Sequence, residues 1–157
     1  MQTIRLLLTT LLMTVAVTLN AQNAETLYQQ AKQLLDAEQY TQAVPKLEAA
    51  ARKGHKKAQY WLGWCYDKGK GVAEDNAKAA QWYAKGAAQN HAKSQYQLGK
   101  CYLKGKGVAK DEARAKQLLL KAVNNPKGGD KVLEKLRKKA GEGDEDAVRI
   151  LNLIGRR

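Results

Sequence analysis

The fold is decided by the stretch Ala58-Gln-Tyr-Trp-Leu-Gly-Trp-Cys-Tyr-Asp-Lys-Gly-Lys-Gly-Val72, which returns almost unchanged as Ser94-Gln-Tyr-Gln-Leu-Gly-Lys-Cys-Tyr-Leu-Lys-Gly-Lys-Gly-Val108. The two copies lie 94 − 58 = 36 residues apart, and no insertion separates their matched positions. Self-similarity at a fixed period of this length is typical of stacked repeats, in which each unit is one supersecondary element. The sequence therefore predicts a repeat array, with the rest of the chain forming flanks and caps.

The regions around the repeated stretch have the residue spacing of amphipathic helices. Leu27, Ala31 and Leu35 recur every four residues, as the buried face of a helix does. The two Gly-Lys-Gly runs suit the ends of first helices, and Asp75 and Asp111 suit the beginnings of second helices. We therefore expect three helical hairpins, which cover residues 24–53, residues 56–67 with 75–88, and residues 92–104 with 111–124.

These residues resemble a known repeat family. The shared pattern Ala/Ser-Gln-Tyr-x-Leu-Gly-x-Cys-Tyr-x-x-Gly-Lys-Gly-Val, followed by Ala79-Ala-Gln-Trp-Tyr-Ala-Lys-Gly-Ala87, is similar to Sel1-like repeats of the tetratricopeptide superfamily. The resemblance is strong over residues 40–124, whereas residues 24–53 look more like the parent tetratricopeptide pattern. It implies an all-α, right-handed α-solenoid of stacked antiparallel helix pairs. It also implies a protein-binding scaffold without a cofactor, rather than an enzyme.

The C-terminal part departs from the repeat pattern. Asn124-Asn-Pro-Lys-Gly-Gly129 is a turn-rich break, after which helices are expected over residues 130–140 and 144–154. The last helix echoes the first helix of the second unit at an offset of 151 − 62 = 89 residues, so it resembles a degenerate repeat. Terminal repeats are atypical because one face meets water. The predicted organisation is a signal peptide (1–21), a tetratricopeptide-like hairpin (22–55), two Sel1-like repeats (56–91 and 92–127) and a degenerate C-terminal helical cap (128–157).

The first 21 residues have the layout of a secretory signal peptide. Arg5 is their only charged residue, residues 6–19 are uncharged and largely apolar, and Ala21 precedes a polar segment. The alternative is an uncleaved membrane anchor, although the uncharged run is shorter than the roughly 20 residues that a spanning helix needs. Cleavage after Ala21 would leave 157 − 21 = 136 residues with a net charge of 13 − 1 = +12. We therefore expect an exported protein, periplasmic or secreted.

Composition limits the class of protein and of partner. With 44% hydrophobic and 27% charged residues the chain is able to fold, and two cysteines are too few for a disulfide-framed mini-domain. The net charge of +13 favours anionic partners. Dense basic runs at residues 52–57 and 135–139 suit either solvated helix faces or contact with an anionic envelope polymer or lipid. Nucleic acid is disfavoured by the predicted export and by the lack of a recognised reading module.

The histidines and cysteines suggest a metal site that helix geometry opposes. His55 with Cys65, and His91 with Cys101, form a repeated His-x9-Cys pair. Ten helical residues rise about 15 Å, whereas zinc ligands lie roughly 2 Å from one metal. No metal site is therefore expected, and both cysteines suit small buried positions. A disulfide between them is disfavoured, because packed helices lie about 8–10 Å apart and a disulfide needs Cα atoms within about 7 Å.

One branch of the family that the sequence resembles is a reason to look for enzymatic activity. In that cysteine-rich branch, cysteines eight residues apart link each helix pair. The branch is associated with binding and hydrolysis of β-lactams. Here Ala87 and Gln95 stand in the corresponding slots, so the framework is absent. A serine hydrolase needs a serine beside a base. Ser94 is the only serine, and other units have Ala58 and Ala147 in its place, which favours a packing role. No catalytic residue is predicted.

What remains is a binding surface on the first helices, which line the concave face of such stacks. Side chains one helical turn apart form three neighbouring rows of tyrosine or tryptophan followed by lysine. These rows are Tyr28 with Lys32; Tyr60, Trp64 and Lys68; and Tyr96, Lys100 and Lys104. The alternative is that the tyrosines only pack between repeats. We expect a monomer that binds a protein or peptide partner, for which an acidic or extended chain would suit these residues, with Trp64 as an aromatic anchor where other units have lysine.

Overall fold

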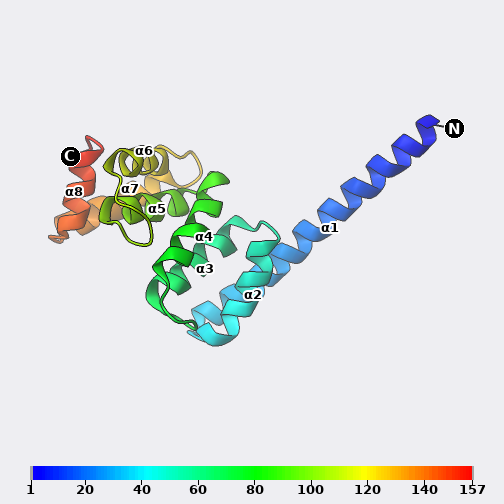
Figure 1. Ribbon diagram of the computed structural model, residues 1–157, viewed down its shortest axis with the longest axis horizontal. Coiled ribbons are helices and arrows are strands. Elements are labelled where there is room, and N and C mark those ends of the chain that lie inside the picture. The colour runs from blue at the N-terminus through cyan, green and yellow to red at the C-terminus, as the bar shows by residue number, and fades with distance from the viewer. Residues whose placement is uncertain (1, 157) are drawn as a thin grey trace.

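A computed structural model describes the backbone of residues 2–156 and the side chains of residues 12–156. The outermost residues of the predicted signal peptide and cap, Met1 and Arg157, lie outside the described part. Within it the chain forms eight α-helices and no strand, which confirms the predicted all-α class (Figure 1). The helices are α1 (Gln2–Asp36), α2 (Tyr40–Arg52), α3 (Lys56–Lys68), α4 (Asn76–Ala88), α5 (Ala92–Lys104), α6 (Glu112–Val123), α7 (Gly129–Gly141) and α8 (Glu145–Leu153).

Consecutive helices pack on one another from α1 through to α8. The pairs α1–α2, α3–α4 and α5–α6 are the expected hairpins, and their bounds agree with the expected ones to within one or two residues except at the start of α1. Local chemistry explains the other bounds. Asp75 and Asp111 accept hydrogen bonds from the backbone N–H groups of Lys78 and Arg114, both at 2.9 Å, and so begin α4 and α6. Gly105, with φ +69°, ends α5.

The second glycine of each Gly-Lys-Gly run lies between repeats. A Cβ atom on Gly71 would come within 3.0 Å of the Tyr40 carbonyl at the start of α2. A Cβ atom on Gly107 would come equally close to the Asn76 carbonyl at the start of α4. Both glycines also have φ above +70°, which other residues rarely adopt. Each loop therefore lies directly on the second helix of the preceding repeat, and only glycine fits there.

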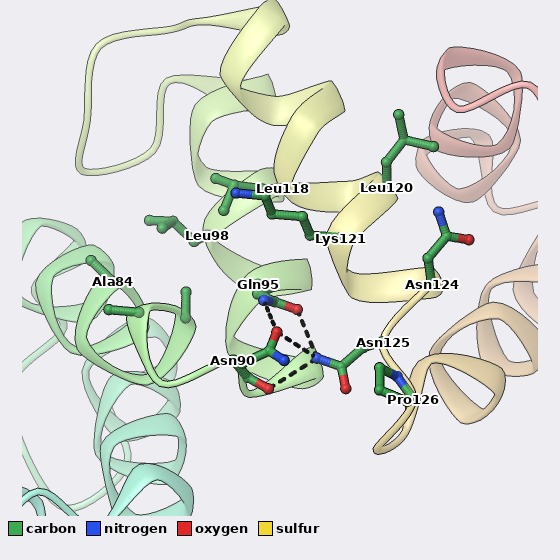
Figure 2. A pocket seen from close by; sticks show the side chains of 12 residues that line it. Ala84, Asn90, Gln95, Leu98, Leu118, Leu120, Lys121, Asn124, Asn125 and Pro126 are labelled. Carbon is green, nitrogen blue, oxygen red and sulfur yellow. Dashed lines mark hydrogen bonds between the residues drawn. The ribbon is translucent and has the colours of Figure 1, made fainter.

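Side-chain amides connect neighbouring repeats in an arrangement that we call the amide clamp. Asn125 Nδ2 donates to the Asn90 carbonyl at 2.9 Å and to Gln95 Oε1 at 3.1 Å (Figure 2). One repeat earlier, Gln89 Nε2 donates to the Gly54 carbonyl and to Gln59 Oε1, both at 2.8 Å. The donors are 125 − 89 = 36 residues apart, so the clamp has the period of the sequence. Its hydrogen bonds fix how one unit is seated on the next.

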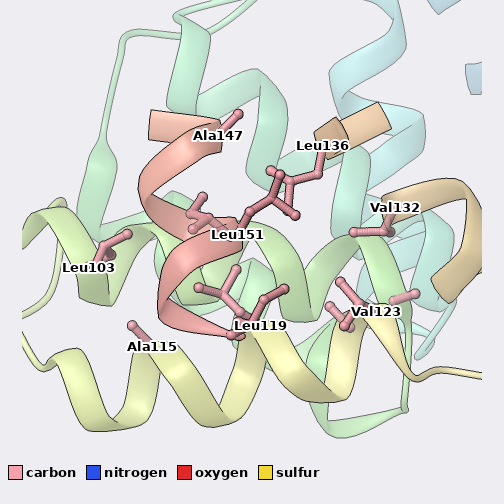
Figure 3. Close-up of a cluster of buried hydrophobic side chains, with 12 residues drawn as sticks. Leu103, Ala115, Leu119, Val123, Val132, Leu136, Ala147 and Leu151 are labelled. Atoms are coloured by element: carbon pink, nitrogen blue, oxygen red, sulfur yellow. The ribbon is translucent and has the colours of Figure 1, made fainter. Parts of the chain in front are cut away.

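The hydrophobic core repeats with the same period and is closed by the last two helices. Leu47, Tyr83 and Leu119 are fully buried at 36-residue spacing on the second helices. Towards the C-terminus, α7 and α8 cover α5 and α6 through contacts that include Leu136 and Ile150 (Figure 3). These contacts remove apolar surface from water at the end of the array. They join the two C-terminal helices to the third hairpin in one cluster of buried side chains.

The first part of α1 projects away from the array (Figure 1). The apolar side chains of its residues 12–19 are exposed, including Leu12 at 68% and Met13 at 73%, and among the described side chains the buried core begins at Ala24. Lys53 Nζ donates to Asn20 Oδ1 at 3.0 Å in this region. The helix continues without a break from the predicted signal peptide into the first hairpin, which differs from the expected start at residue 24. No helix among the described residues is long and apolar enough to cross a membrane.

Candidate partner-binding groove

A groove of about 300 Å³ lies across α3, α5 and α7. It brings together three of the predicted binding residues, Tyr60, Tyr96 and Lys100. The other described side chains that line it are Lys93, Gln97, Lys131, Val132, Lys135, Leu136 and Lys139. Five of these ten residues are lysines, and none of the ten is acidic. The groove therefore combines an aromatic and apolar floor with a strongly positive potential.

Ring contacts hold Tyr60 in place, and Tyr96 is partly buried against the core cluster that includes Leu136. Tyr60 meets Trp61 and His91 edge-on, with ring centroids 5.3 and 5.5 Å apart. Burial raises the pKa of Tyr60 above its usual value, and burial together with Asp144 and Asp146 raises the pKa of Tyr96 to about 12. Both phenols are therefore neutral at physiological pH. They offer hydrogen-bond donors beside large apolar faces, which is the combination that makes tyrosine common in interfaces.

The lysines of the groove lie against its aromatic rings and repel one another. Lys93 Nζ is 5.8 Å from the ring centre of Tyr60, and Lys100 Nζ is 5.7 Å from that of Tyr96. Burial lowers the pKa of Lys100, and nearby Lys104 lowers it further. Lys139 reaches Asp144 at 3.4 Å. An anion that enters the groove would relieve this repulsion, because it would neutralise closely spaced charges in a partly desolvated site.

The row predicted on α1 does not join the groove. Tyr28 is only 6% exposed, and its ring stacks on His55 with centroids 4.4 Å apart. Lys32 is paired with Asp36 on its own helix. Tyr28 therefore packs in the cluster of buried side chains that joins α1, α2 and α3, and it does not line this groove.

Trp64 also lies outside the groove. It packs against Tyr40 and Trp61, with ring centroids 5.8 and 5.6 Å away, and is half-buried against the same core cluster. Trp61 and Trp64 fill the region next to α1, whereas the equivalent residues one repeat later are Gln97 and Lys100, which line the groove. Trp64, which stands where other units have lysine, therefore packs against neighbouring side chains in this structure.

Lys68 and Lys104 lie at a second, smaller cavity of about 120 Å³ beside the groove. Lys68 pairs with Asp67 at 2.9 Å, and Lys104 pairs with Asp146 of α8. The groove and this cavity share Gln97 and Lys100. Five of the eight predicted binding residues therefore lie along one continuous face.

The lysines of α7 are the part of the groove that the sequence did not place. Lys131, Lys135 and Lys139 face it at intervals of four residues. The basic run at residues 135–139 is the signal in the sequence, but by itself it suits either a solvated helix face or contact with an anionic envelope polymer or lipid. Its position depends on Val132 and Leu136, which dock α7 on the third hairpin. No repeated sequence indicates that docking.

The cysteines and histidines have structural surroundings. Cys65 and Cys101 are free and buried, and burial raises the pKa of each thiol to about 11. His55 accepts a hydrogen bond from Ala58 N–H at Nδ1 (3.1 Å), and its Nε2 lies 2.8 Å from a carboxylate oxygen of Glu25. His55 therefore caps α3 and links it to α1. No group of three or more metal-binding side chains comes together within the part of the chain that is described.

Ser94 lies beside a histidine but has no access to solvent. Its Oγ is 2.9 Å from His91 Nδ1, which resembles half of a catalytic pair. The serine is 0% exposed, and its Oγ faces Gly86 so closely that a Cβ atom on the glycine would clash with it. A substrate carbonyl would therefore not reach the hydroxyl. This arrangement supports the packing role expected for the position.

His91 is expected to make the fold sensitive to mild acid. Burial, with Lys56 and Lys93 nearby, lowers its pKa from 6.5 to about 4. The unfolded chain therefore takes up a proton at higher pH than the folded one, so stability is full above pH 6.5 and falls as the pH drops towards 4. Between pH 7 and 4.5 the loss from this group is expected to be about 1–2 kcal/mol. Urea denaturation at both pH values, with His91→Asn as the comparison, measures it.

The His91→Asn variant retains a residue that begins helices well but removes the titrating ring. Carboxylates with lowered pKa values, such as Asp67, titrate at lower pH in both proteins. The variant should therefore lose less stability than the natural chain over this pH range. Equal losses would show that His91 is not the group responsible.

A larger hollow of about 690 Å³ lies between α4, α5 and α6. Three of its four uncharged polar residues, Asn90, Gln95 and Asn125, are those of the amide clamp and hydrogen-bond with one another (Figure 2). Its remaining lining is largely alanine and leucine, with Lys121 as its one charged side chain. Size alone therefore does not make it the better site. The groove has the converging charges and rings that recognition requires.

Comparisons with known proteins identify the repeats. The sequence model of the Sel1 repeat matches residues 56–91 and 92–126. No curated protein matches the sequence significantly. Among solved structures, a Sel1 repeat protein from Oxalobacter formigenes is 30% identical, with a TM-score of 0.63, over 81% of this chain and 54% of that one. The chain thus spans about half of that relative.

Two further structures are similar. A protective antigen of uropathogenic Escherichia coli with an SLR fold is 28% identical, with a TM-score of 0.61, over 85% of this chain and 30% of that one. Cysteine rich protein B of Helicobacter pylori is 27% identical, with a TM-score of 0.59, over 72% of this chain and 87% of that one. These matches confirm the α-solenoid fold class. The chain therefore contains two Sel1 repeats, and its fold is similar to that of Sel1 repeat proteins, a tetratricopeptide-like group whose members are generally non-catalytic scaffolds for protein interactions.

Proposed function

We propose that this protein is an exported scaffold that binds an acidic protein or peptide segment in the groove across α3, α5 and α7. The observation that carries the proposal is the lining itself, in which Tyr60 and Tyr96 form the floor among five lysines and no acid. The rings supply apolar area and hydrogen-bond donors at low entropic cost. The lysines supply attraction for a negatively charged partner and discrimination against a positive one.

Export is the second part of the proposal. The apolar side chains of residues 12–19 are exposed, and the described core begins at Ala24, so cleavage after Ala21 would remove none of the described core residues. Mass spectrometry of the protein purified from its own cells tests this step. The mature chain should begin at Gln22. Recovery of the chain with its first residues still attached would contradict the cleavage.

The groove is tested by charge reversal at Lys135. Lys135→Glu should weaken binding of an acidic partner at least tenfold, because it replaces an attraction with a repulsion inside the site. Lys116→Glu is the matched control, since it changes the net charge equally on an exposed part of α6 outside the groove. Calorimetry with acetyl-(Glu)8-amide measures both variants. Crosslinking of the mature chain in its own envelope fraction then shows whether natural partners follow the same pattern.

An alternative is that the basic surface binds an anionic envelope polymer or lipid without a specific site. The lysines of α7 favour it, since Lys131, Lys135 and Lys138 also line a shallow hollow on that helix. Such binding depends on total charge and weakens as salt rises. It predicts equal losses from Lys116→Glu and Lys135→Glu and no loss from Tyr96→Ala. The groove instead predicts a clear loss from Tyr96→Ala and a small one from Lys116→Glu.

A further inference from the structure

The small cavity beside the groove contains an unpaired polar group. Tyr83 is 1% exposed, lines the cavity, and its hydroxyl has no hydrogen-bond partner within the described structure. A buried hydroxyl is normally paired, because leaving it unpaired costs stability. Unlike the other buried residues of α4, Tyr83 thus carries a side-chain hydroxyl, and this hydroxyl forms no hydrogen bond within the described structure.

Packing does not explain the hydroxyl. The equivalent residues in the neighbouring repeats are Leu47 and Leu119, both fully buried. The ring of Tyr83 lies on Gly63 much as Leu119 lies on Gly99, since a Cβ atom on either glycine would come 2.8 Å from the side chain above it. A leucine would therefore fill the same slot. The slot therefore does not require the hydroxyl, which is unpaired and belongs to a residue that lines the cavity.

A second polar residue enters the cavity where a neighbouring repeat is apolar. Asp67 stands 36 residues before Leu103, which is buried in the core. The Asp67 carboxylate accepts hydrogen bonds from Lys106 Nζ at 2.7 Å and pairs with Lys68 at 2.9 Å. Lys106 comes from the Gly-Lys-Gly loop of the next repeat, so this network ties two repeats together at the cavity wall.

These pairs leave one lysine of the cavity without a carboxylate. Four lysines line it, of which Lys68 and Lys106 pair with Asp67, and Lys104 pairs with Asp146. Lys100 makes no ion pair with any described carboxylate, and it lies on the boundary between the cavity and the groove. A half-buried, unpaired ammonium group and a buried, unpaired hydroxyl therefore line the same small space.

We propose that this cavity receives the carboxylate of one acidic side chain from a peptide bound in the groove, held by the Lys100 ammonium group and the Tyr83 hydroxyl. The inference rests on the proposed function, because the peptide backbone would lie in the groove. The cavity volume of about 120 Å³ equals roughly four water molecules at about 30 Å³ each, which suits a carboxyl group and its methylene. Water would pair the hydroxyl, but it would leave the charge of Lys100 unbalanced.

Tyr83→Phe tests the inference in two measurements. It should weaken binding of acetyl-(Glu)8-amide about tenfold in calorimetry, the size of one hydrogen bond to a charged group. It should also raise the melting temperature of the free protein by a few degrees, since the variant no longer buries an unpaired hydroxyl. Tyr102→Phe is the matched control, because it removes a tyrosine hydroxyl outside the cavity and should leave peptide affinity unchanged.

The outcomes separate this inference from the proposed function. Unchanged affinity in Tyr83→Phe, with a clear loss in Lys135→Glu, overturns the cavity assignment and leaves the groove in place. Unchanged affinity in both variants overturns both proposals. Inorganic phosphate is the third probe. If it binds with the same dependence on Tyr83 and the peptide does not compete with it, the cavity is a site for a free anion and the assignment to a peptide side chain is wrong.

Discussion

Gly107→Ala is expected to lower the free energy of unfolding by about 3–4 kcal/mol, the largest effect of any substitution considered for this chain. Two causes add. Gly107 has φ +73°, where a Cβ atom is strained by roughly 1 kcal/mol. The new Cβ atom would also press on the backbone of Asn76 and Ala77 at the start of α4, which has no flexible side chain to move aside. The loop would have to leave the preceding repeat.

Urea denaturation followed by circular dichroism measures this loss. Gly143→Ala is the matched control, because Gly143 has φ +86° but no atom within 4 Å of a Cβ atom placed on it. That variant isolates the backbone cost and should lose only about 1 kcal/mol. If both variants lost the same stability, the contact between the loop and α4 would contribute nothing, and the glycine would be needed for its backbone angle alone.

Asn125→Ala is expected to lower the free energy of unfolding by about 2–3 kcal/mol. Asn125 is 5% exposed, and its Nδ2 donates to the Asn90 carbonyl and to Gln95 Oε1. Its Oδ1 accepts from Lys127 N–H at 2.9 Å and so orders the turn before α7. Alanine would remove these hydrogen bonds together and would leave polar atoms, among them Oε1 of the buried Gln95, without this partner. Such atoms cost more than the hydrogen bond itself contributes.

The repeat provides its own control for this effect. Gln89 holds the equivalent position in the preceding clamp but is exposed, so water can replace its hydrogen bonds to Gly54 and Gln59. Gln89→Ala is therefore expected to lose less than about 1 kcal/mol. A loss as large as that of Asn125→Ala would show that the clamp stabilises the fold equally where water can reach its polar groups. Burial of those groups would then not be the cause of the effect.

Those parts of the fold that repeat could be predicted from the sequence. The bounds of α3 to α6 were predicted to within one or two residues. They followed from the period of 36 residues, from Asp75 and Asp111 at the helix starts, and from the paired glycines at the helix ends. These signals act locally, through helix termini and turns, and so are visible in a single chain. The fold class followed from the same residues through the family resemblance, and the comparisons confirm it.

The placement of the groove depended on contacts that a local pattern does not contain. Tyr28, Tyr60 and Tyr96 have equivalent places in the three first helices, but Trp61 and Trp64 pack against the cluster that buries Tyr28. One repeat later Gln97 and Lys100 leave the corresponding space open. The groove therefore begins at α3 instead of α1. Its far wall is α7, whose docking through Val132 and Leu136 is tertiary and has no counterpart elsewhere in the sequence.

Three contacts between repeats among the described residues each link one unit to the next. Gly107 meets Asn76, Lys106 meets Asp67, and Asn125 meets Asn90, each across fewer than 40 residues of chain. Duplication of residues 56–91 in tandem would therefore regenerate these contacts at the new boundary. It would also add another tyrosine at the position of Tyr60. The proposed binding face would thus change length by gain or loss of whole units, without a new fold.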